Sequence, residues 1–362
     1  MSALTGSTLG HRGLRHLQTA PHTVLLSQRP ALLLSTSQSP PVRSAGRHSL
    51  RQISIAASKQ AGRSKAKQQD KDDSPDDFHY ACPICQQTEF SLSSSASRLS
   101  TRLHCPRCSR TYISKDGYTD LTLSSGIEQR SYQQSFWAGT EIFRSPLISY
   151  VYERGWRQGF SWAGFPGAAK ETQMALDYLR PANAKVLLDL SCGSGLFSRR
   201  FLQSGQFEKI IASDFSEQML QQASRFFFDD VQLDRRRFML VRADAGRLPF
   251  KSGSLGAIHA GAAMHCWPDP TAAMAEISRV LRPGGVYVAS TFMTIDSPLG
   301  QLLGDDNIRP LNQLAAPFNS STYKWWSEPE LRDLMATVGL QGFQRYRNRQ
   351  CILFTVQKPA ES

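Results

Sequence analysis

The stretch LLDLSCGSGLF, residues 187–197, decides the fold. Its apolar half is typical of a short strand that is buried on both faces, as in a parallel sheet. Gly193 and Gly195 follow where this strand should turn into a helix. Glycines allow a ligand to approach the backbone closely, and the N–H groups at the start of the helix would point at it. We therefore expect a ligand to bind against this turn.

The residues that follow repeat the alternation of strand and helix. Short apolar runs suited to buried strands recur at 209–214, 238–244, 255–261 and 286–292. Segments suited to amphipathic helices lie at 196–205, 216–228 and 270–281. This alternation predicts an α/β fold with a Rossmann-like parallel sheet covered by helices on both faces. The runs 341–348 and 351–357 are separated by a turn alone, so we expect a hairpin that ends the sheet in an antiparallel strand.

Acidic residues in the first three predicted strands suggest the type of ligand. Asp189 lies in the first run, Asp214 ends the second and Asp244 ends the third. A carboxylate at the end of the second strand is suited to accept the hydroxyls of a ribose. A nicotinamide dinucleotide fits poorly, because Ser198 stands where its fingerprint needs a third glycine and Asp189 would repel a pyrophosphate. A ligand with an ammonium and a sulfonium group, such as S-adenosylmethionine, fits better.

Two motifs resemble those of class I S-adenosylmethionine-dependent methyltransferases. DLSCGSG at 189–195 resembles the family's D-x-G-x-G-x-G motif with Ser191 in place of the first glycine, and RVLRPGG at 279–285 is similar to a later signature. The resemblance implies a seven-stranded methyltransferase sheet over residues 167–358. It also implies the cofactor-binding residues, which are Asp189, Ser191, Gly193 and Gly195 around the methionine moiety, Asp214 at the ribose, and Asp244 with Ala245 at the adenine.

The same resemblance suggests where a catalytic base would lie. In this family the loop after the fourth strand faces the transferred methyl group, which makes His265 our candidate base. His259 lies inside the strand, so we expect it to be packed. No motif typical of amino-group methylation follows the fourth strand, which leaves an oxygen or carbon acceptor.

Four cysteines form two C-x2-C pairs that predict a zinc ribbon over residues 80–122. They are Cys82, Cys85, Cys105 and Cys108. Thiolates at this spacing can surround one zinc ion and stabilise a segment too small to bury a core of its own. Two disulfides or a ribbon without metal are the alternatives. A full set of four protein ligands would make the zinc structural.

The first 69 residues differ in charge from the rest of the chain. They hold ten Lys and Arg residues and no acid, so that the remainder carries +2 of the total charge of +12. We expect a transit peptide over 1–69, chloroplast or alternatively mitochondrial, followed by a linker over 70–79. A retained basic tail is the alternative. The apolar run at 23–34 is too short to span a membrane.

Aromatic residues gather between the ribbon and the first strand. Residues 131–165 contain ten of them, and we expect a helical aromatic-rich cap over 127–166. Binding sites for small molecules are mostly apolar, so some of these rings would contact a substrate. Our candidate pocket residues are Trp162, Trp267, Trp325 and Trp326.

Two narrower resemblances suggest different acceptors. SCGSGLFSR at 191–199 and GAAMHCWPDP at 261–270, with the leader and the C-x2-C pairs, resemble plant and algal chloroplast methyltransferases of plastoglobules, related to the type 11 enzymes that methylate ubiquinone and menaquinone precursors. The ribbon followed by KDGYTDL at 115–121 resembles ribosomal RNA guanine-N1 methyltransferases. These resemblances imply a lipophilic acceptor, with peripheral contact to plastid lipid bodies, or RNA.

Charge favours the small lipophilic acceptor over RNA. RNA binding draws affinity from Lys and Arg that neutralise phosphates, and an excess of +2 outside the leader is small. Arg345, Arg347 and Arg349 alternate along a terminal strand and fit a solvated edge. A scaffold protein that keeps the fold without catalysis is a third interpretation, for which Ser191 is the main argument.

Overall fold

The computed structural model describes residues 79–94, 101–126, 157–230, 232–294 and 324–360. The predicted leader, the linker up to residue 78 and the predicted cap up to residue 156 lie outside these ranges. The described end of that cap contains a 3-10 helix, η4 (Arg157–Ser161). None of the described helices combines the length and the apolar character needed to cross a lipid bilayer.

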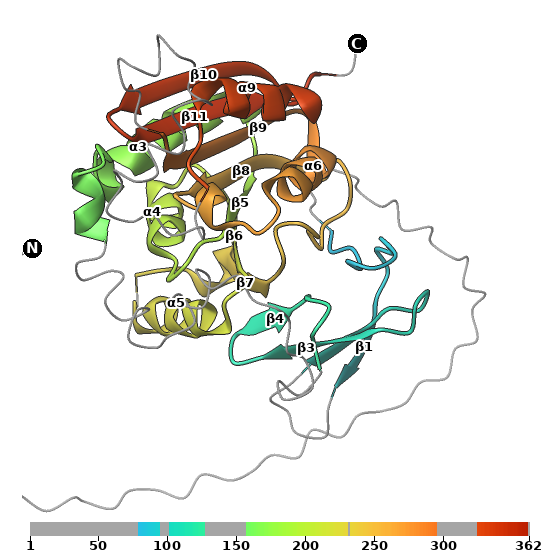
Figure 1. Cartoon of the computed structure of the whole chain (residues 1–362). Coiled ribbons are helices and arrows are strands. Elements are labelled where there is room, and N and C mark those ends of the chain that lie inside the picture. Colours follow the sequence, from blue (N-terminus) through green and yellow to red (C-terminus); the bar gives the residue numbers. More distant parts are fainter. Residues whose placement is uncertain (1–78, 95–100, 127–156, 231, 295–323, 361–362) are drawn as a thin grey trace, which may run out of the picture. The chain divides into compact units, whose positions relative to one another are not determined.

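A single sheet of eleven strands forms the centre of the described residues (Figure 1). Their order is β1-β2-β3-β4-β7-β6-β5-β8-β9-β11-β10. The strands from β5 onward are β5 (Val186–Leu190), β6 (Lys209–Asp214), β7 (Phe238–Arg242), β8 (Leu255–Gly261), β9 (Leu281–Phe292), β10 (Gln341–Asn348) and β11 (Cys351–Gln357). β7, β6, β5, β8 and β9 pair in parallel, whereas β11 is antiparallel to both β9 and β10. The predicted seven-stranded sheet with an antiparallel last strand is therefore confirmed.

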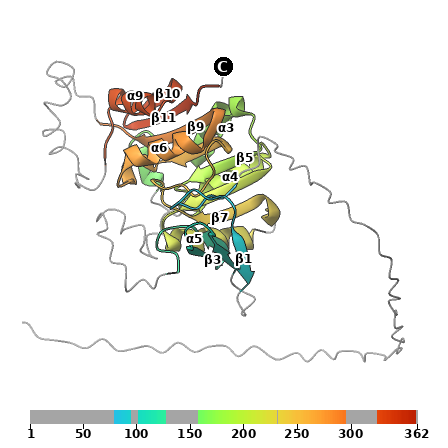
Figure 2. The ribbon, with the colours of Figure 1, turned by 90° about the vertical axis from the view of Figure 1, so that its right-hand side faces the viewer.

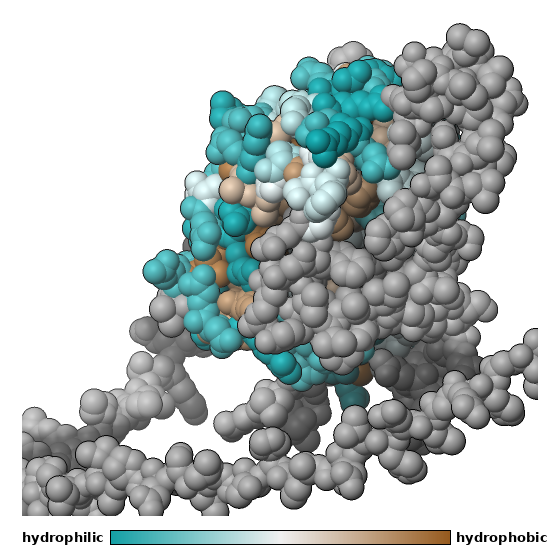
Figure 3. Space-filling view, turned by 60° about the vertical axis from the view of Figure 1, so that its left-hand side comes forward, coloured by the Kyte–Doolittle hydropathy of each residue, from teal (hydrophilic) through white to brown (hydrophobic). Residues whose placement is uncertain are grey.

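Alternating residues of the strands point to the two faces of the sheet, and the two faces pack in separate core clusters. In β5, Leu188 packs in one core cluster with α6 and α9, while Leu187 packs in another with α3 and α4. Within the described ranges the α-helices are α3 (Ala168–Leu179), α4 (Leu196–Ser204), α5 (Glu217–Asp229), α6 (Pro270–Val280) and α9 (Glu328–Thr337). In the space-filling view, hydrophilic residues are interspersed with hydrophobic areas (Figure 3), as expected where helices bury only one face.

Local signals in the sequence set the helix ends. α4 begins after Gly195 and ends at Gly205, which have φ angles of 80° and 74° that favour glycine. The Ser216 hydroxyl accepts a hydrogen bond from the Met219 N–H and caps α5, as the sequence suggests. α9 starts with a capping box between Ser327 and Glu330. These ends fix where the loops at the strand ends begin.

Two predicted boundaries differ in the structure. β9 already begins at Leu281, because Pro283 and the two following glycines join the strand through an irregularity in its pairing with β8. β7 ends at Arg242, so Asp244 lies beyond the strand in a turn. The second difference moves a predicted site residue from a strand end into a loop.

The ribbon extends the sheet instead of forming a separate unit, which the sequence did not indicate. Its strands are β1 (Ser91–Ser94), β2 (Thr101–His104), β3 (Thr111–Lys115) and β4 (Tyr118–Asp120), and β4 pairs in parallel with β7. Both ribbon views place these strands beyond β7 (Figure 1; Figure 2). Cys82, Cys105 and Tyr112 also pack in one cluster with Leu248 and Phe250 of the loop after β7. The ribbon therefore shares the core of the sheet.

Candidate active site at the carboxyl ends of the strands

The turn after β5 adopts left-handed backbone conformations at three positions. Ser191, Gly193 and Gly195 have φ angles of 56°, 57° and 80°. A Cβ atom on Gly195 would lie 3.0 Å from the Phe227 ring of α5, so a side chain there would also clash with packing. Ser191 occupies a conformation that favours glycine. This explains why the D-x-G-x-G-x-G motif has a glycine at the position of Ser191. Its hydroxyl accepts a hydrogen bond from the Trp267 indole N–H at 2.9 Å, which ties the turn to the loop after β8.

The Asp214 carboxylate joins the turn after β5 to the turn after β6. One oxygen accepts a hydrogen bond from the Gly193 N–H at 2.9 Å, and the other accepts one from the Ser216 N–H at 2.8 Å. Burial raises the pKa of Asp214 even though these backbone hydrogen bonds lower it. A carboxylate has about four lone-pair positions, so the two oxygens can accept further hydrogen bonds from a ligand. This geometry fits the ribose position that the sequence suggested.

Asp189, which the sequence analysis placed at the methionine moiety of the cofactor, occupies a different environment from Asp214. Its side chain is 1% exposed. One oxygen accepts a hydrogen bond from His259 Nδ1 at 2.8 Å, and the other accepts one from the Ser198 hydroxyl. His259 is buried between the Phe197 and Phe201 rings of α4. Asp189 therefore acts inside the fold, where it connects β5 with α4 and β8.

Asp244 and Ala245 lie in an exposed turn after β7. One Asp244 oxygen accepts a hydrogen bond from the Gly246 N–H at 2.9 Å, and the Arg247 N–H closes the turn on the Asp244 carbonyl. The Ala243 N–H donates to the carbonyl oxygen of Asp214 at 3.1 Å. The two acid-bearing turns after β6 and β7 are therefore joined through their backbones.

The loop after β8 carries His265 beside aromatic rings. His265 lies in a short 3-10 helix, η7 (Met264–Cys266), and is half-buried. Burial lowers its pKa to about 4, so the imidazole is neutral near pH 7. Burial and the nearby charge of Asp214 raise the pKa of the adjacent Cys266 thiol to about 12. The next residue, Trp267, donates its hydrogen bond to Ser191, so this loop lies beside the turn after β5.

An aromatic cluster surrounds Phe292, the last residue of β9. Its ring centroid lies 4.8 Å from those of His265 and Phe165, 5.1 Å from that of Phe160 and 5.4 Å from that of Trp325. Residues 163–165 are held against the β10–β11 turn by hydrogen bonds, including one from the Asn348 amide to the Gly164 carbonyl at 2.9 Å. Phe292 was not among the residues predicted for the site, although its position at the end of a predicted strand was a usable signal.

The four predicted pocket tryptophans do not line one site. Trp162 is 83% exposed, whereas Trp326 is 1% exposed and belongs to the main core. Trp267 is buried against the turn after β5 through its bond to Ser191. Trp325 alone of the four joins the cluster around Phe292. Trp325 and Trp326 differ because neighbouring residues of an extended segment point to opposite sides.

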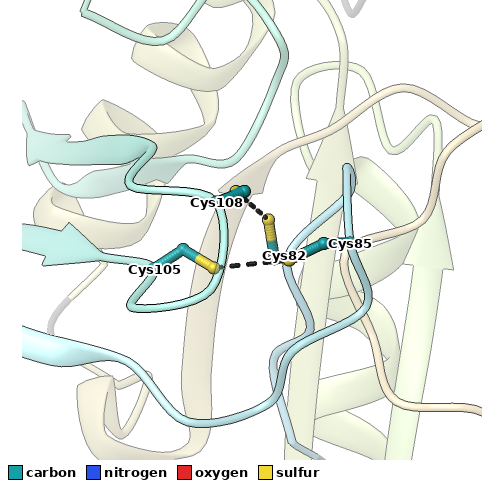
Figure 4. Close-up of side chains that lie close together, drawn as sticks. All are labelled: Cys82, Cys85, Cys105 and Cys108. Carbon is teal, nitrogen blue, oxygen red and sulfur yellow. Dashed lines mark hydrogen bonds between the residues drawn. The ribbon is translucent and has the colours of Figure 1, made fainter.

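The four cysteines of the ribbon converge at a second site (Figure 4). All four sulfur atoms lie within 4.8 Å of one another, with 3.6 Å between Cys82 and Cys108 and 3.5 Å between Cys85 and Cys105. All four are free thiols, so the structure does not support the alternative of two disulfides. Four thiols arranged in this way can bind one metal ion.

Known proteins similar to this chain are methyltransferases. The profile of a family described as "Methyltransferase domain" matches residues 188–289. Two uncharacterized chloroplastic methyltransferases of Arabidopsis thaliana are each 43% identical to the chain; the alignments cover 77% of this chain and 78% and 79% of those proteins. A demethylmenaquinone methyltransferase of Clavibacter sepedonicus is 31% identical, and its alignment covers 47% of this chain and 69% of that protein.

These similarities agree with the strand order and with the left-handed turn after β5. The matched profile runs from β5 to β9, the part of the sheet whose loops carry Asp214, Asp244 and His265. The chain belongs to the class I S-adenosylmethionine-dependent methyltransferases and shares its family with the chloroplastic enzymes.

Proposed function

We propose that this methyltransferase transfers the methyl group of S-adenosylmethionine to an oxygen or carbon atom of a small, lipophilic, prenylquinone-like acceptor in the chloroplast. The observation that carries the proposal is the aromatic cluster around Phe292, which includes His265 and Trp325. Flat apolar rings favour a flat apolar acceptor. The name of the Clavibacter relative, a demethylmenaquinone methyltransferase, agrees with an acceptor of this class.

The turns after β5, β6 and β7 would bind the cofactor. Its sulfonium group supplies a methyl group that is already activated for transfer. In this assignment Ser191, Gly193 and Gly195 form the turn against the methionine moiety. Asp214 accepts hydrogen bonds from the ribose hydroxyls, and Asp244 with Ala245 lies at the adenine. Asp189 supports the turn from inside, through Ser198 and His259.

His265 would assist the transfer by accepting a proton from a hydroxyl acceptor. The neutral form of the imidazole is the form that can accept a proton, and burial favours that form. A pKa of about 4 makes it a weak base, so the proton would move only as the new bond to the methyl group forms. Alignment of the acceptor by the surrounding rings then contributes the larger part of the rate.

Charge on the terminal strands argues against RNA as the acceptor. Arg345 lies 2.5 Å and Arg347 lies 4.0 Å from the Glu328 carboxylate of α9. Arg332 contacts the same carboxylate at 2.9 Å. The single Glu328 carboxylate thus reduces the positive charge that these arginines offer, whereas a phosphate track needs uncompensated positive charge.

The proposed location is the chloroplast, in the stroma or at the surface of plastoglobules. Both Arabidopsis relatives are named as chloroplastic. The composition of residues 1–69 is that of a transit peptide. A prenylquinone-like acceptor partitions into lipid, so peripheral contact with a lipid body would bring the enzyme to its substrate.

The His265 assignment predicts a specific dependence of stability on pH. The pKa of about 4 in the folded state lies below the ordinary value of 6.5, so the unfolded chain binds a proton at His265 that the folded chain does not. Stability should therefore fall as the pH drops from about 6.5 to about 4. The stability of the His265→Phe variant should fall less over this range, as measured by chemical denaturation at pH 7 and pH 5. The substitution should also lower kcat about tenfold to a hundredfold. An identical pH dependence in the variant would contradict the burial of His265.

The acceptor class can be tested directly with radiolabelled S-adenosylmethionine. The chain from residue 70 onward is incubated with a plastid lipid extract or with deproteinised ribosomal RNA. Label is expected in the lipid fraction, and a quinone-like product should carry it. Asp214→Asn serves as the control for cofactor-dependent transfer. Label in RNA alone would overturn the lipophilic acceptor, and label in neither fraction would do the same.

Substitutions of the neighbouring Trp325 and Trp326 should have different effects. Trp325→Ala should lower kcat/KM for the acceptor about tenfold, because a ring beside His265 is lost, with little change in cofactor affinity. Trp326→Ala should instead lower the free energy of unfolding by about 3–5 kcal/mol, the usual cost of a cavity in a core. Steady-state kinetics and denaturant titration distinguish them. If both variants fold stably and lose kcat/KM to a similar extent, the different roles assigned to Trp325 and Trp326 would be wrong.

We also propose that the four ribbon cysteines bind one structural zinc ion. Tetrahedral coordination with Zn–S bonds of about 2.3 Å places sulfur atoms roughly 3.8 Å apart, close to the observed 3.5 and 3.6 Å. Four protein ligands leave no position for a substrate. Cys82 and Cys105 are buried together with the loop after β7, so the metal would stabilise the sheet as well as the ribbon.

Elemental analysis of reduced, freshly purified protein should find one zinc per chain. Cys105→Ser should lower the metal content and the melting temperature of the whole unit, because the ribbon and the sheet share a core. Cys266→Ser changes an isolated thiol and is the matched control, in which the zinc content should stay the same. A protein without zinc, or a Cys105→Ser variant that melts like the wild type, would refute the assignment.

A further inference from the structure

The ribbon contacts the turn that carries Asp214 through an almost buried ion pair. Asp120 of β4 and Arg242 of β7 lie 3.0 Å apart, with side chains that are 7% and 14% exposed. The same Asp120 carboxylate accepts hydrogen bonds from the Thr122 N–H and hydroxyl. A buried pair of this kind holds its partners in one geometry, because separating them leaves an uncompensated charge.

Arg242 extends this contact to the end of β6. Its Nε donates a hydrogen bond to the Phe215 carbonyl oxygen at 3.0 Å, while Nη1 donates to Asp120. Phe215 stands between Asp214 and the cap residue Ser216. The planar guanidinium therefore fixes the backbone of the Asp214 turn relative to the ribbon, which a single ammonium group cannot do.

A second contact reaches the start of α5. The Tyr118 hydroxyl of β4 donates a hydrogen bond to the Glu217 carboxylate, and Lys115 lies 3.0 Å from the same group. Burial opposes the charge of Glu217, but these two hydrogen bonds outweigh it and lower the pKa. Burial also raises the pKa of Tyr118, so the phenol keeps the proton that it donates. Glu217 directly follows the cap residue whose N–H is bound by Asp214.

Residues 79–81, at the start of the ribbon segment, bind the end of the loop after β7. The Ala81 N–H donates to the Pro249 carbonyl at 2.9 Å, and the Lys251 N–H donates to the His79 carbonyl at 2.9 Å. Tyr80 forms a β-bridge with Phe250, and their rings stack at 6.1 Å. This loop begins with the Asp244 turn. Both ends of the ribbon segment thus contact loops of the proposed cofactor site.

We propose that the ribbon segment 79–122 is a structural part of the cofactor site and holds the Asp214 and Asp244 turns in their binding conformation. Arg242 and Tyr118 are positioning residues, which act on the cofactor through Phe215 and Glu217. The proposal rests on the placement of S-adenosylmethionine at these turns. It assigns the ribbon a role in cofactor affinity, beyond any role in folding.

Two conservative variants test the proposal. Arg242→Lys keeps a positive charge opposite Asp120 but loses the fork to Phe215, and Tyr118→Phe loses only the hydroxyl on Glu217. Each should raise the Kd for S-adenosylmethionine about fivefold to tenfold, less than for a lost direct hydrogen bond to a charged group, because the residues act on the cofactor only through the turn that they hold. The KM for the cofactor should rise equally while kcat at saturating cofactor stays unchanged, because the acceptor side is intact.

Arg345→Lys is the matched control. It makes the same substitution in an arginine–glutamate pair on β10, the strand at the opposite end of the sheet from the ribbon. Calorimetry measures the Kd of each variant, and circular dichroism confirms that it is folded. If Arg242→Lys does not fold, Tyr118→Phe decides the question.

The outcomes separate this proposal from the assignment on which it rests. Weaker cofactor binding in the ribbon variants but not in Arg345→Lys supports a positioning role. Binding like the wild type in the folded ribbon variants, or an equal loss in Arg345→Lys, overturns it while the cofactor assignment stands. Wild-type affinity in Asp214→Asn overturns the cofactor placement, and the proposal fails with it.

Discussion

The geometry of the strand ends depends on one carboxylate, that of Asp214. The carboxylate accepts hydrogen bonds from N–H groups of the turn after β5 and of the cap of α5, and the backbone carbonyl oxygen of Asp214 accepts one from the Ala243 N–H after β7. Three loops from distant parts of the sequence are therefore joined at a single residue. This position is costly, since burial raises the pKa of Asp214 and works against the charge. The hydrogen bonds offset part of that cost and leave the oxygens oriented for a ligand.

The architecture of the sheet was predictable because its signals are local. Apolar runs, glycines at helix ends and the short connection before Cys351 each act over a few residues, and the observed strands β6, β8, β10 and β11 have the predicted bounds. The docking of the ribbon had no such signal. β4 pairs with β7 across more than a hundred residues of sequence, and the ion pair between Asp120 and Arg242 joins the same two strands. Nothing near either residue reveals its partner.

The contacts of the candidate site residues could not be predicted, because the sequence shows residue types without their surroundings. Asp189 and Asp214 look equivalent as acids in or after buried strands, yet His259 and Ser198 engage Asp189 inside the fold whereas Asp214 lies at the turn. Neighbouring tryptophans were likewise grouped together, although an extended backbone sends Trp325 towards the aromatic cluster and Trp326 into the core. Each difference is decided by tertiary contacts that become visible only when the strands are paired.

The two sides of the site are stabilised by different physical means, and this difference bears on specificity. On the side of β6 and β7, hydrogen bonds and a nearly buried ion pair fix the backbone, which suits a ligand whose shape and charges do not vary. On the side of β8 and β9, rings pack around Phe292 with few directional bonds. Packed rings tolerate changes in shape better than a polar network does. Under the proposed function, the sheet would combine a rigid site for a fixed cofactor with an adaptable surface for the acceptor, and the ribbon would strengthen the side where rigidity matters.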